Sequence, residues 1–269
     1  MLLKYLLALA IAASPLTLIK PVQALTLIST SNGQVGSIDA QTGTFTGLTS
    51  GQAYTDIALD SQGELWGSTF NELYKIGLDN GQQSRVGPFG ASINGLGFSD
   101  QDELYATGGA NFYKVDLTNG NAALVGRNSR FQSSGDLVFD PIQQRFFATS
   151  RNGIGTNSLF LFNLAGESVE IGDIGFNNVY GLFFEEGVLY GHTGNRQQLT
   201  IDINTGQGQF DQNLDGVSGA VWGTASLPTT GSTPDVPEPK SVPEPFMVLS
   251  WFGLAGLALT GGLRRRHQN

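Results

Sequence analysis

Short apolar stretches separated by polar turns repeat along residues 25–226 with a period of about 40 residues. The first half of each repeat is a short apolar strand, a turn that ends in glycine and a second strand. The residues that open these turns are Asp39, Gly77, Asp116, Asn163 and Asp202. They are 38, 39, 47 and 39 residues apart, so the third interval contains an insertion, which we place at about residues 151–157. Aspartate suits such a position because its carboxylate accepts hydrogen bonds from the backbone that follows it.

The second half of each repeat alternates apolar and other residues with a period of two, as a strand does. The alternating pairs are Ile57/Leu59, Leu96/Phe98, Leu137/Phe139, Leu182/Phe184 and Ala220/Trp222. A polar turn and one more strand follow at 65–68, 104–107, 146–149 and 189–192. No part of this region has apolar residues at the 3.6-residue spacing of a helix. The pattern therefore predicts an all-β domain.

The number of strands predicts how this domain closes. Each repeat has four strands. The first three strands occur five times, whereas the fourth strand occurs only four times before the repeats end near residue 225. Leu27–Thr30 has the pattern of the missing strand, so we expect it to pair with the last strand, at Val217–Thr224. Five four-stranded sheets joined into a ring describe a five-bladed β-propeller. The region resembles the propeller domains of exported bacterial proteins, although it has no strict WD or Kelch motif; a β-sandwich is the alternative.

The N-terminal residues have the pattern of a secretory signal peptide. Lys4 provides a positive charge, and the apolar run at 6–13 follows it. Val22 and Ala24 are the small residues that signal peptidase needs at the −3 and −1 positions. The signal peptide therefore covers residues 1–24, and the repeats form an ectodomain over residues 25–226.

The C-terminal residues have the pattern of a membrane span. Residues 246–263 contain no charged side chain and are just long enough to cross about 30 Å of hydrocarbon. Arg264, Arg265 and Arg266 follow directly, and such a basic cluster remains on the cytoplasmic side of a membrane. We therefore expect an inner-membrane anchor with a cytoplasmic C-terminus and an exported ectodomain.

Val242, Pro243, Glu244 and Pro245 come directly before this span. A Pro-Glu-Pro motif, an apolar span and a terminal arginine cluster resemble the PEP-CTERM sorting segment, which here covers residues 242–269. The resemblance implies that an exosortase processes the tail during export, so that the anchor is transient and the product reaches the cell surface or extracellular matrix. An earlier Pro-Glu-Pro copy lies in a linker, residues 227–241, whose Pro, Thr and Ser content predicts an extended spacer.

Composition and charge exclude several classes of protein. The chain of 269 residues has no cysteine, which excludes thiolate catalysis, disulfides and cysteine-ligated zinc. Its formal net charge is −9, and residues 25–245 alone have nine basic and 23 acidic side chains, a charge of −14. Such a domain is unsuited to nucleic acid. We identify no cofactor motif, and the acidic turns at 100–103 and 185–186 lack the spacing of a calcium loop.

Five residues are candidates for contact with a ligand: Trp66, Tyr105, Tyr190, His192 and Trp222. The first three are aromatic residues at one repeat position, which favours packing between blades, with stacking on sugar rings as the alternative. His192 stands where the other repeats have serine or threonine. No catalytic residue can be named, because the chain has no G-x-S-x-G motif and its acidic residues cannot be paired from the sequence.

These features together predict an exported, exosortase-processed bacterial surface or matrix protein. Its propeller would be a non-catalytic module that binds a polysaccharide or another extracellular partner. One alternative is a hydrolase or lyase that acts on glycans at the propeller mouth, and another is a purely structural matrix component. Three or more polar or acidic side chains that converge at the mouth would favour the enzyme. A mouth lined by glycine, serine and aromatic residues would favour binding, and a plugged mouth would favour the structural component.

Overall fold

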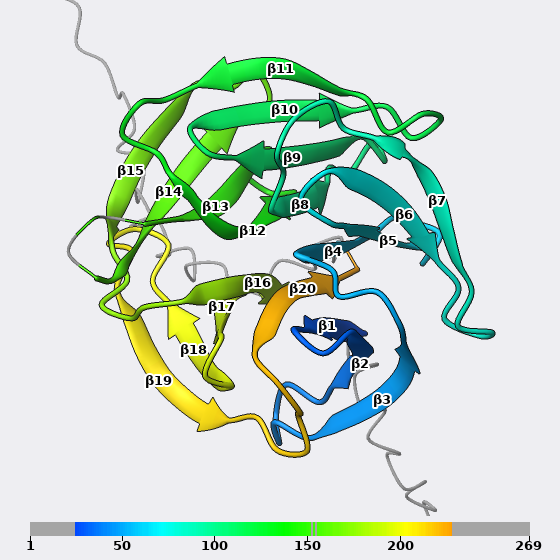
Figure 1. Cartoon of the computed structure of the whole chain (residues 1–269). Coiled ribbons are helices and arrows are strands. Elements are labelled where there is room, and N and C mark those ends of the chain that lie inside the picture. Colours follow the sequence, from blue (N-terminus) through cyan, green and yellow to red (C-terminus); the bar gives the residue numbers. More distant parts are fainter. Residues whose placement is uncertain (1–24, 152, 154, 228–269) are drawn as a thin grey trace, which may run out of the picture. The chain divides into compact units, whose positions relative to one another are not determined.

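A computed structural model describes residues 25–151, 153 and 155–227, which form twenty strands and no helix (Figure 1). The strands make five separate four-stranded sheets, each antiparallel throughout. Blade 1 contains β20 (Val221–Ser226), β1 (Thr26–Thr30), β2 (Gln34–Ile38) and β3 (Phe45–Ser50). Blade 2 contains β4 (Asp56–Leu59), β5 (Leu65–Ser68), β6 (Glu72–Ile76) and β7 (Gln83–Pro88).

The other three blades are built by consecutive strands. Blade 3 contains β8 (Gly95–Phe98), β9 (Leu104–Gly108), β10 (Asn111–Val115) and β11 (Ala122–Arg127). Blade 4 contains β12 (Ser133–Asp140), β13 (Arg145–Arg151), β14 (Asn157–Asn163) and β15 (Ser168–Asp173). Blade 5 contains β16 (Val179–Glu185), β17 (Val188–Thr193), β18 (Gln197–Ile201) and β19 (Gly208–Asn213). The first strand of each blade, as written here, is its inner strand, and the five inner strands contact one another around a central channel.

The first and last described strands close the ring within one blade. β1 pairs with β20, with Leu27 opposite Ala225 and Ile28 opposite Thr224. The five-bladed propeller and its closure by the N-terminal strand are thus confirmed, and the β-sandwich is excluded. The last strand begins at Val221 rather than at residue 217, because residues 214–220 form a loop. The predicted alternation at Ala220/Trp222 was therefore wrong in register.

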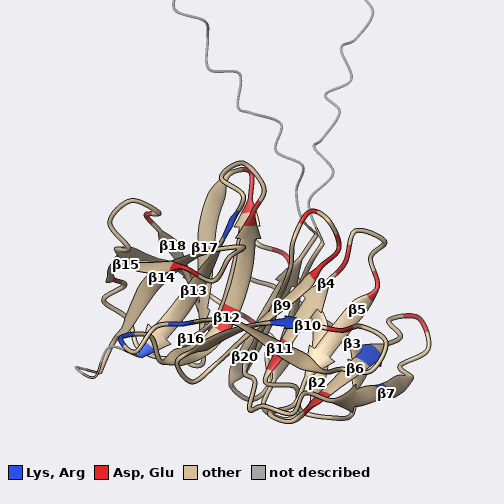
Figure 2. Cartoon of the chain, turned by 90° about the horizontal axis from the view of Figure 1, so that it is seen from above, with Lys and Arg blue, Asp and Glu red and all other residues tan. Residues whose placement is uncertain are grey.

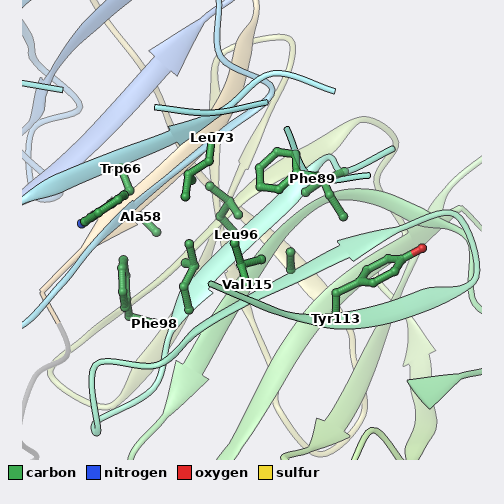
Figure 3. Close-up of a cluster of buried hydrophobic side chains, with 11 residues drawn as sticks. Ala58, Trp66, Leu73, Phe89, Leu96, Phe98, Tyr113 and Val115 are labelled. Carbon is green, nitrogen blue, oxygen red and sulfur yellow. The ribbon is translucent and has the colours of Figure 1, made fainter. Parts of the chain in front are cut away.

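Apolar side chains are buried mainly between neighbouring blades. One such cluster joins blades 2 and 3, where Trp66 and Ala58 face Phe98 and Leu96 (Figure 3). Similar clusters join blades 3 and 4, blades 4 and 5, and blades 1 and 2. Each blade therefore needs its neighbours to bury its faces, which explains why the apolar pattern recurs in every repeat.

The repeat turns are held as the sequence predicts. The carboxylate of Asp39 accepts hydrogen bonds from the backbone N–H groups of Gln41 and Thr42, and Asp116 and Asp202 open their turns in the same way. The long third interval is absorbed by blade 4, where β12, β13 and β14 have eight, seven and seven residues.

The predicted signal peptide (1–24), most of the predicted linker (227–241) and the predicted sorting segment (242–269) lie outside the described residues. Within the described part of the chain, no helix could cross a membrane.

Candidate functional site

Two buried carboxyl groups, those of Asp56 and Asp136, occupy the central channel. We call them the carboxylate pair. Their residues are 0% and 1% exposed, and their side chains hydrogen-bond to each other. They also accept hydrogen bonds from one backbone N–H group of every inner strand. The five donors belong to Ile57, Leu96, Leu137, Leu182 and Thr224.

The hydrogen bonds are divided unequally between the two carboxyl groups. Asp56 accepts from Ile57 at 2.8 Å and from Leu96 at 2.6 Å. Asp136 accepts three, from Leu137 and Leu182, each at 2.5 Å, and from Thr224 at 3.2 Å. The pair therefore crosslinks all five blades at the axis of the ring, where backbone polar groups would otherwise have no partner.

The other three inner strands have glycine at the position of the two aspartates, which leaves space for the carboxylate pair. Gly95, Gly181 and Gly223 stand at the positions that correspond to Asp56 and Asp136. A Cβ atom on Gly223 would lie 2.6 Å from the Cα atom of Asp56 and would also clash with its carboxylate. The layer thus has two carboxyl groups and three glycines because five side chains would not fit.

The carboxylate pair shares a proton. Burial raises the pKa of Asp56 well above its usual range, and the adjacent Asp136 carboxylate raises it further. Burial also raises the pKa of Asp136, while its backbone donors act in the opposite direction. Because Asp136 has three of these donors and Asp56 has two, we assign the proton to Asp56 and the negative charge to Asp136.

The pair is unsuited to hydrolysis of glycosidic bonds. Catalytic carboxyl groups in glycosidases face the substrate and are about 5 Å or more apart, so that a sugar or water can react between them. Asp56 and Asp136 are in contact, are closed off from solvent and are saturated by backbone donors. They plug the channel and stabilise the ring.

Above this plug, one end of the channel opens into a pocket of about 200 Å³, which we call the mouth. It is lined by Thr55, Phe70, Asn94, Ser134, Arg151, Tyr180 and Trp222. All five blades contribute, and five of these residues lie at or just before the start of an inner strand. The opposite end of the channel is closed by apolar residues and leaves a space of only about 30 Å³.

Several mouth residues are held in place by hydrogen bonds. The hydroxyl of Tyr180 donates to the side-chain oxygen of Asn178 at 2.8 Å. Ser134 accepts a 2.7 Å hydrogen bond from the buried amide of Asn157, so its own proton is available for a ligand. Thr55 is bonded to Ser68. The pocket therefore combines three aromatic rings with preorganised hydroxyl groups, an arrangement that can bind a sugar ring.

The mouth differs from the rest of the repeat in one informative way. Interior positions of the inner strands carry similar apolar residues in blades 2 to 5, such as Leu and Phe. The five mouth residues contributed by the inner strands are instead a threonine, an asparagine, a serine, a tyrosine and a tryptophan. Packing between repeats would favour similar residues, so packing alone does not explain this variety. Comparison of the residues directly before Asp56, Gly95, Asp136, Gly181 and Gly223 could have found four of the five from the sequence.

Of the five predicted ligand residues, Trp222 lines the mouth. Trp66 packs against Phe98 of blade 3 and donates a hydrogen bond to Asp60. Tyr105 stacks on Phe112 within blade 3, and its ring centroid lies 5.1 Å from that of Phe146 of blade 4. Tyr190 stacks on Phe183 with ring centroids 5.0 Å apart. Trp66 and Tyr105 thus pack between blades, whereas the Tyr190 ring stacks within blade 5, and the structure brings none of the three to the mouth.

His192 is fully buried within a polar network. Its ring nitrogens lie 2.9 Å from the Thr224 hydroxyl and 3.1 Å from the Gln198 side-chain oxygen. The amide of Gln198 donates in turn to the carbonyl oxygen of Ala40 at 2.7 Å. Burial lowers the pKa of His192 to about 4, so the ring is neutral at physiological pH. It therefore connects blades 5 and 1 and does not reach the mouth.

Charge is distributed unevenly between the two ends of the channel. Many acidic side chains lie in the hairpins at the end opposite the mouth, where the described chain also begins and stops (Figure 2). These residues are Asp39, Asp60, Glu64, Asp79, Asp100, Asp102, Glu103, Asp116, Asp140, Glu167, Glu185, Glu186 and Asp202. Among the described residues, no group of three or more acidic or histidine side chains is arranged to hold a metal ion.

The fold and the site together define a five-bladed β-propeller with a plugged channel and an aromatic mouth. In sequence, the chain matches no known protein family and no curated protein. Solved structures share its fold at low identity. A chain of the nidogen/laminin complex is 9% identical, with a TM-score of 0.57 over 76% of this chain and 98% of that one.

Two bacterial structures are similar to a comparable extent. A Bacteroides thetaiotaomicron protein of unknown function is 12% identical, with a TM-score of 0.52 over 78% of this chain and 66% of that chain. A gluconolactonase from Xanthomonas campestris is 13% identical, with a TM-score of 0.50 over 73% and 79% of the two chains. At these identities the likeness concerns the fold alone.

Proposed function

We propose that this chain is an exported bacterial surface or extracellular-matrix protein, processed by an exosortase, whose propeller binds a polysaccharide without catalysis. The main support for this proposal is the composition of the mouth. All five blades contribute to it, its residues vary from repeat to repeat, and three aromatic rings stand beside hydroxyl and amide groups. The signal peptide and the Pro243-Glu244-Pro245 motif support export and sorting.

The position of the chain ends is compatible with this function. Residues 226 and 227 lie at the closed end of the channel, and Trp222 lies at the mouth. The described chain therefore stops at the end of the domain opposite the mouth.

Two alternative functions have less support. The similar gluconolactonase suggests a hydrolase, but the mouth has no aspartate, glutamate or histidine among its lining residues to act as acid or base. The similar chain from a complex of nidogen and laminin suggests a protein partner. The pocket favours a small ring over a protein, because most protein interfaces are broad and much flatter.

A glycan array probed with the full chain in mild detergent tests the proposal. We expect binding to a restricted set of glycans, and we expect Trp222→Ala combined with Tyr180→Ala to abolish it. Phe210→Ala is the matched control, because Phe210 is 51% exposed on the outer strand β19 and does not line the mouth. Binding that survives the double substitution would contradict the proposal, and binding to no glycan at all would favour a structural role.

A further inference from the structure

The mouth has a charge that sets it apart from the rest of the domain. The described residues include 20 acidic and eight basic side chains, yet the lining of the mouth contains no acidic residue and a single basic one, Arg151. A neutral sugar would not need a charged group in the pocket. A cationic ligand would need an acidic side chain in the pocket, and the lining has none.

Arg151 also differs from half of the eight described basic residues, which are held by ion pairs. Four ion pairs are formed, by Lys75 with Glu64, Arg85 with Glu72, Lys114 with Glu103 and Arg130 with Glu170. The exposed Arg151 side chain has no ion pair with any described acidic residue. Its planar guanidinium presents several N–H donors in a geometry that fits the two oxygens of a carboxylate or sulfate.

The acidic end of the domain would not repel an anion at this position. Thr55 and Asp60 flank the two ends of β4, and five residues of strand span about 16 Å. That distance is about twice the Debye length of about 8 Å at physiological ionic strength. The buried charge of the carboxylate pair is nearer, but five backbone N–H groups surround it.

We propose that the mouth selects an acidic sugar, with Arg151 on its carboxylate or sulfate group and the Trp222 and Tyr180 rings against the sugar. This inference rests on the proposed function and adds the class of ligand. Asn94 and Ser134 can bond the sugar hydroxyls. The volume of about 200 Å³ is below the roughly 300–1,000 Å³ typical of ligand pockets, so the site accepts one sugar unit rather than a longer chain.

The test compares three probes with the full chain by isothermal titration: a short oligogalacturonate, the matching neutral oligogalactoside and a sulfated oligogalactoside. We expect at least one acidic probe to bind about tenfold more tightly than the neutral one, and the preferred probe identifies the group. Arg151→Gln should remove this preference, and Arg151→Lys should restore only part of it. Arg130→Gln is the matched control, because Arg130 is an exposed arginine paired with Glu170.

The outcomes separate this inference from the proposed function. Equal affinity for acidic and neutral probes would overturn the acidic-sugar inference and leave the glycan-binding function in place. A preference for acidic probes that persists in Arg151→Gln would place the charge recognition elsewhere and also overturn the inference. Failure of every probe to bind would count against both.

Discussion

Replacement of Asp56 by asparagine tests whether the two channel carboxyl groups share a proton in the folded protein. Asparagine has nearly the shape of protonated aspartic acid and can donate to Asp136. Its side-chain oxygen can accept from Ile57 or from Leu96, but its amide nitrogen cannot accept from the other. One buried N–H group therefore loses its acceptor, which costs about 1–3 kcal/mol of the free energy of unfolding.

The pH dependence of this loss is the sharper result. In the folded state burial raises the pKa of the pair, so folding at a pH between the unfolded and folded pKa takes up a proton that the unfolded chain has released. The associated stability is complete below the unfolded pKa of about 4 and declines as pH rises, by about 1.4 kcal/mol per pH unit for one proton. The asparagine side chain of the variant binds no such proton. The difference in stability between the wild-type chain and Asp56→Asn should therefore shrink as pH rises above about 4, by up to about 1.4 kcal/mol per unit while the folded pair keeps its proton.

Urea denaturation followed by far-ultraviolet circular dichroism at several pH values measures this difference. Asp116→Asn is the control, because Asp116 is an exposed turn residue whose pKa is lowered by hydrogen bonds from Thr118. Its stability difference should stay constant over the same range. A constant difference for Asp56→Asn as well would refute the shared proton.

Other contacts support three further predictions. Gly223→Ala should destabilise the fold by about 2 kcal/mol or more in thermal unfolding, because the new Cβ atom would clash with Asp56. Gly47→Ala is the control and should have little effect, because its Cβ atom would lie 3.7 Å from the Phe45 ring. His192 has a folded pKa of about 4, so its contribution is present above pH 6.5 and is lost as pH falls, by about 1.4 kcal/mol per unit. His192→Gln should lack this decline in denaturation curves between pH 6.5 and 4.5, and an unchanged slope would show that another group titrates. Replacement of Pro243, Glu244 and Pro245 by alanine should leave an unprocessed, membrane-held form on immunoblots of fractionated cells; normal processing would disprove the sorting motif.

The ring could be predicted from the sequence because its evidence is periodic. A strand that is repeated at a fixed interval is recognised without knowing its partner. The extra strand at Leu27–Thr30 could complete only one sheet, because only the last repeat lacked its fourth strand. The predicted register of the last strand was wrong because the sequence pattern made Trp222 look like a core residue of the alternating pair. It is in fact the mouth residue that precedes Gly223, and the loop at 214–220 hides the regular interval.

The candidate site was harder to predict because its residues meet only through the closure of the ring. Asp56 and Asp136 are 80 positions apart, and no local motif connects them. The available signal was their common place in the repeat, directly before an apolar pair, where the other repeats have glycine. Aromatic recurrence at Trp66 and Tyr105 indicated packing, whereas variation between repeats marked the mouth.

The most direct test of the binding function is a crystal structure of the protein with a bound oligosaccharide. We predict electron density for one sugar unit in the mouth, in contact with the rings of Trp222 and Tyr180, above an unchanged carboxylate pair. Density on the outer strands or at the closed end of the channel, with the mouth empty, would contradict the account.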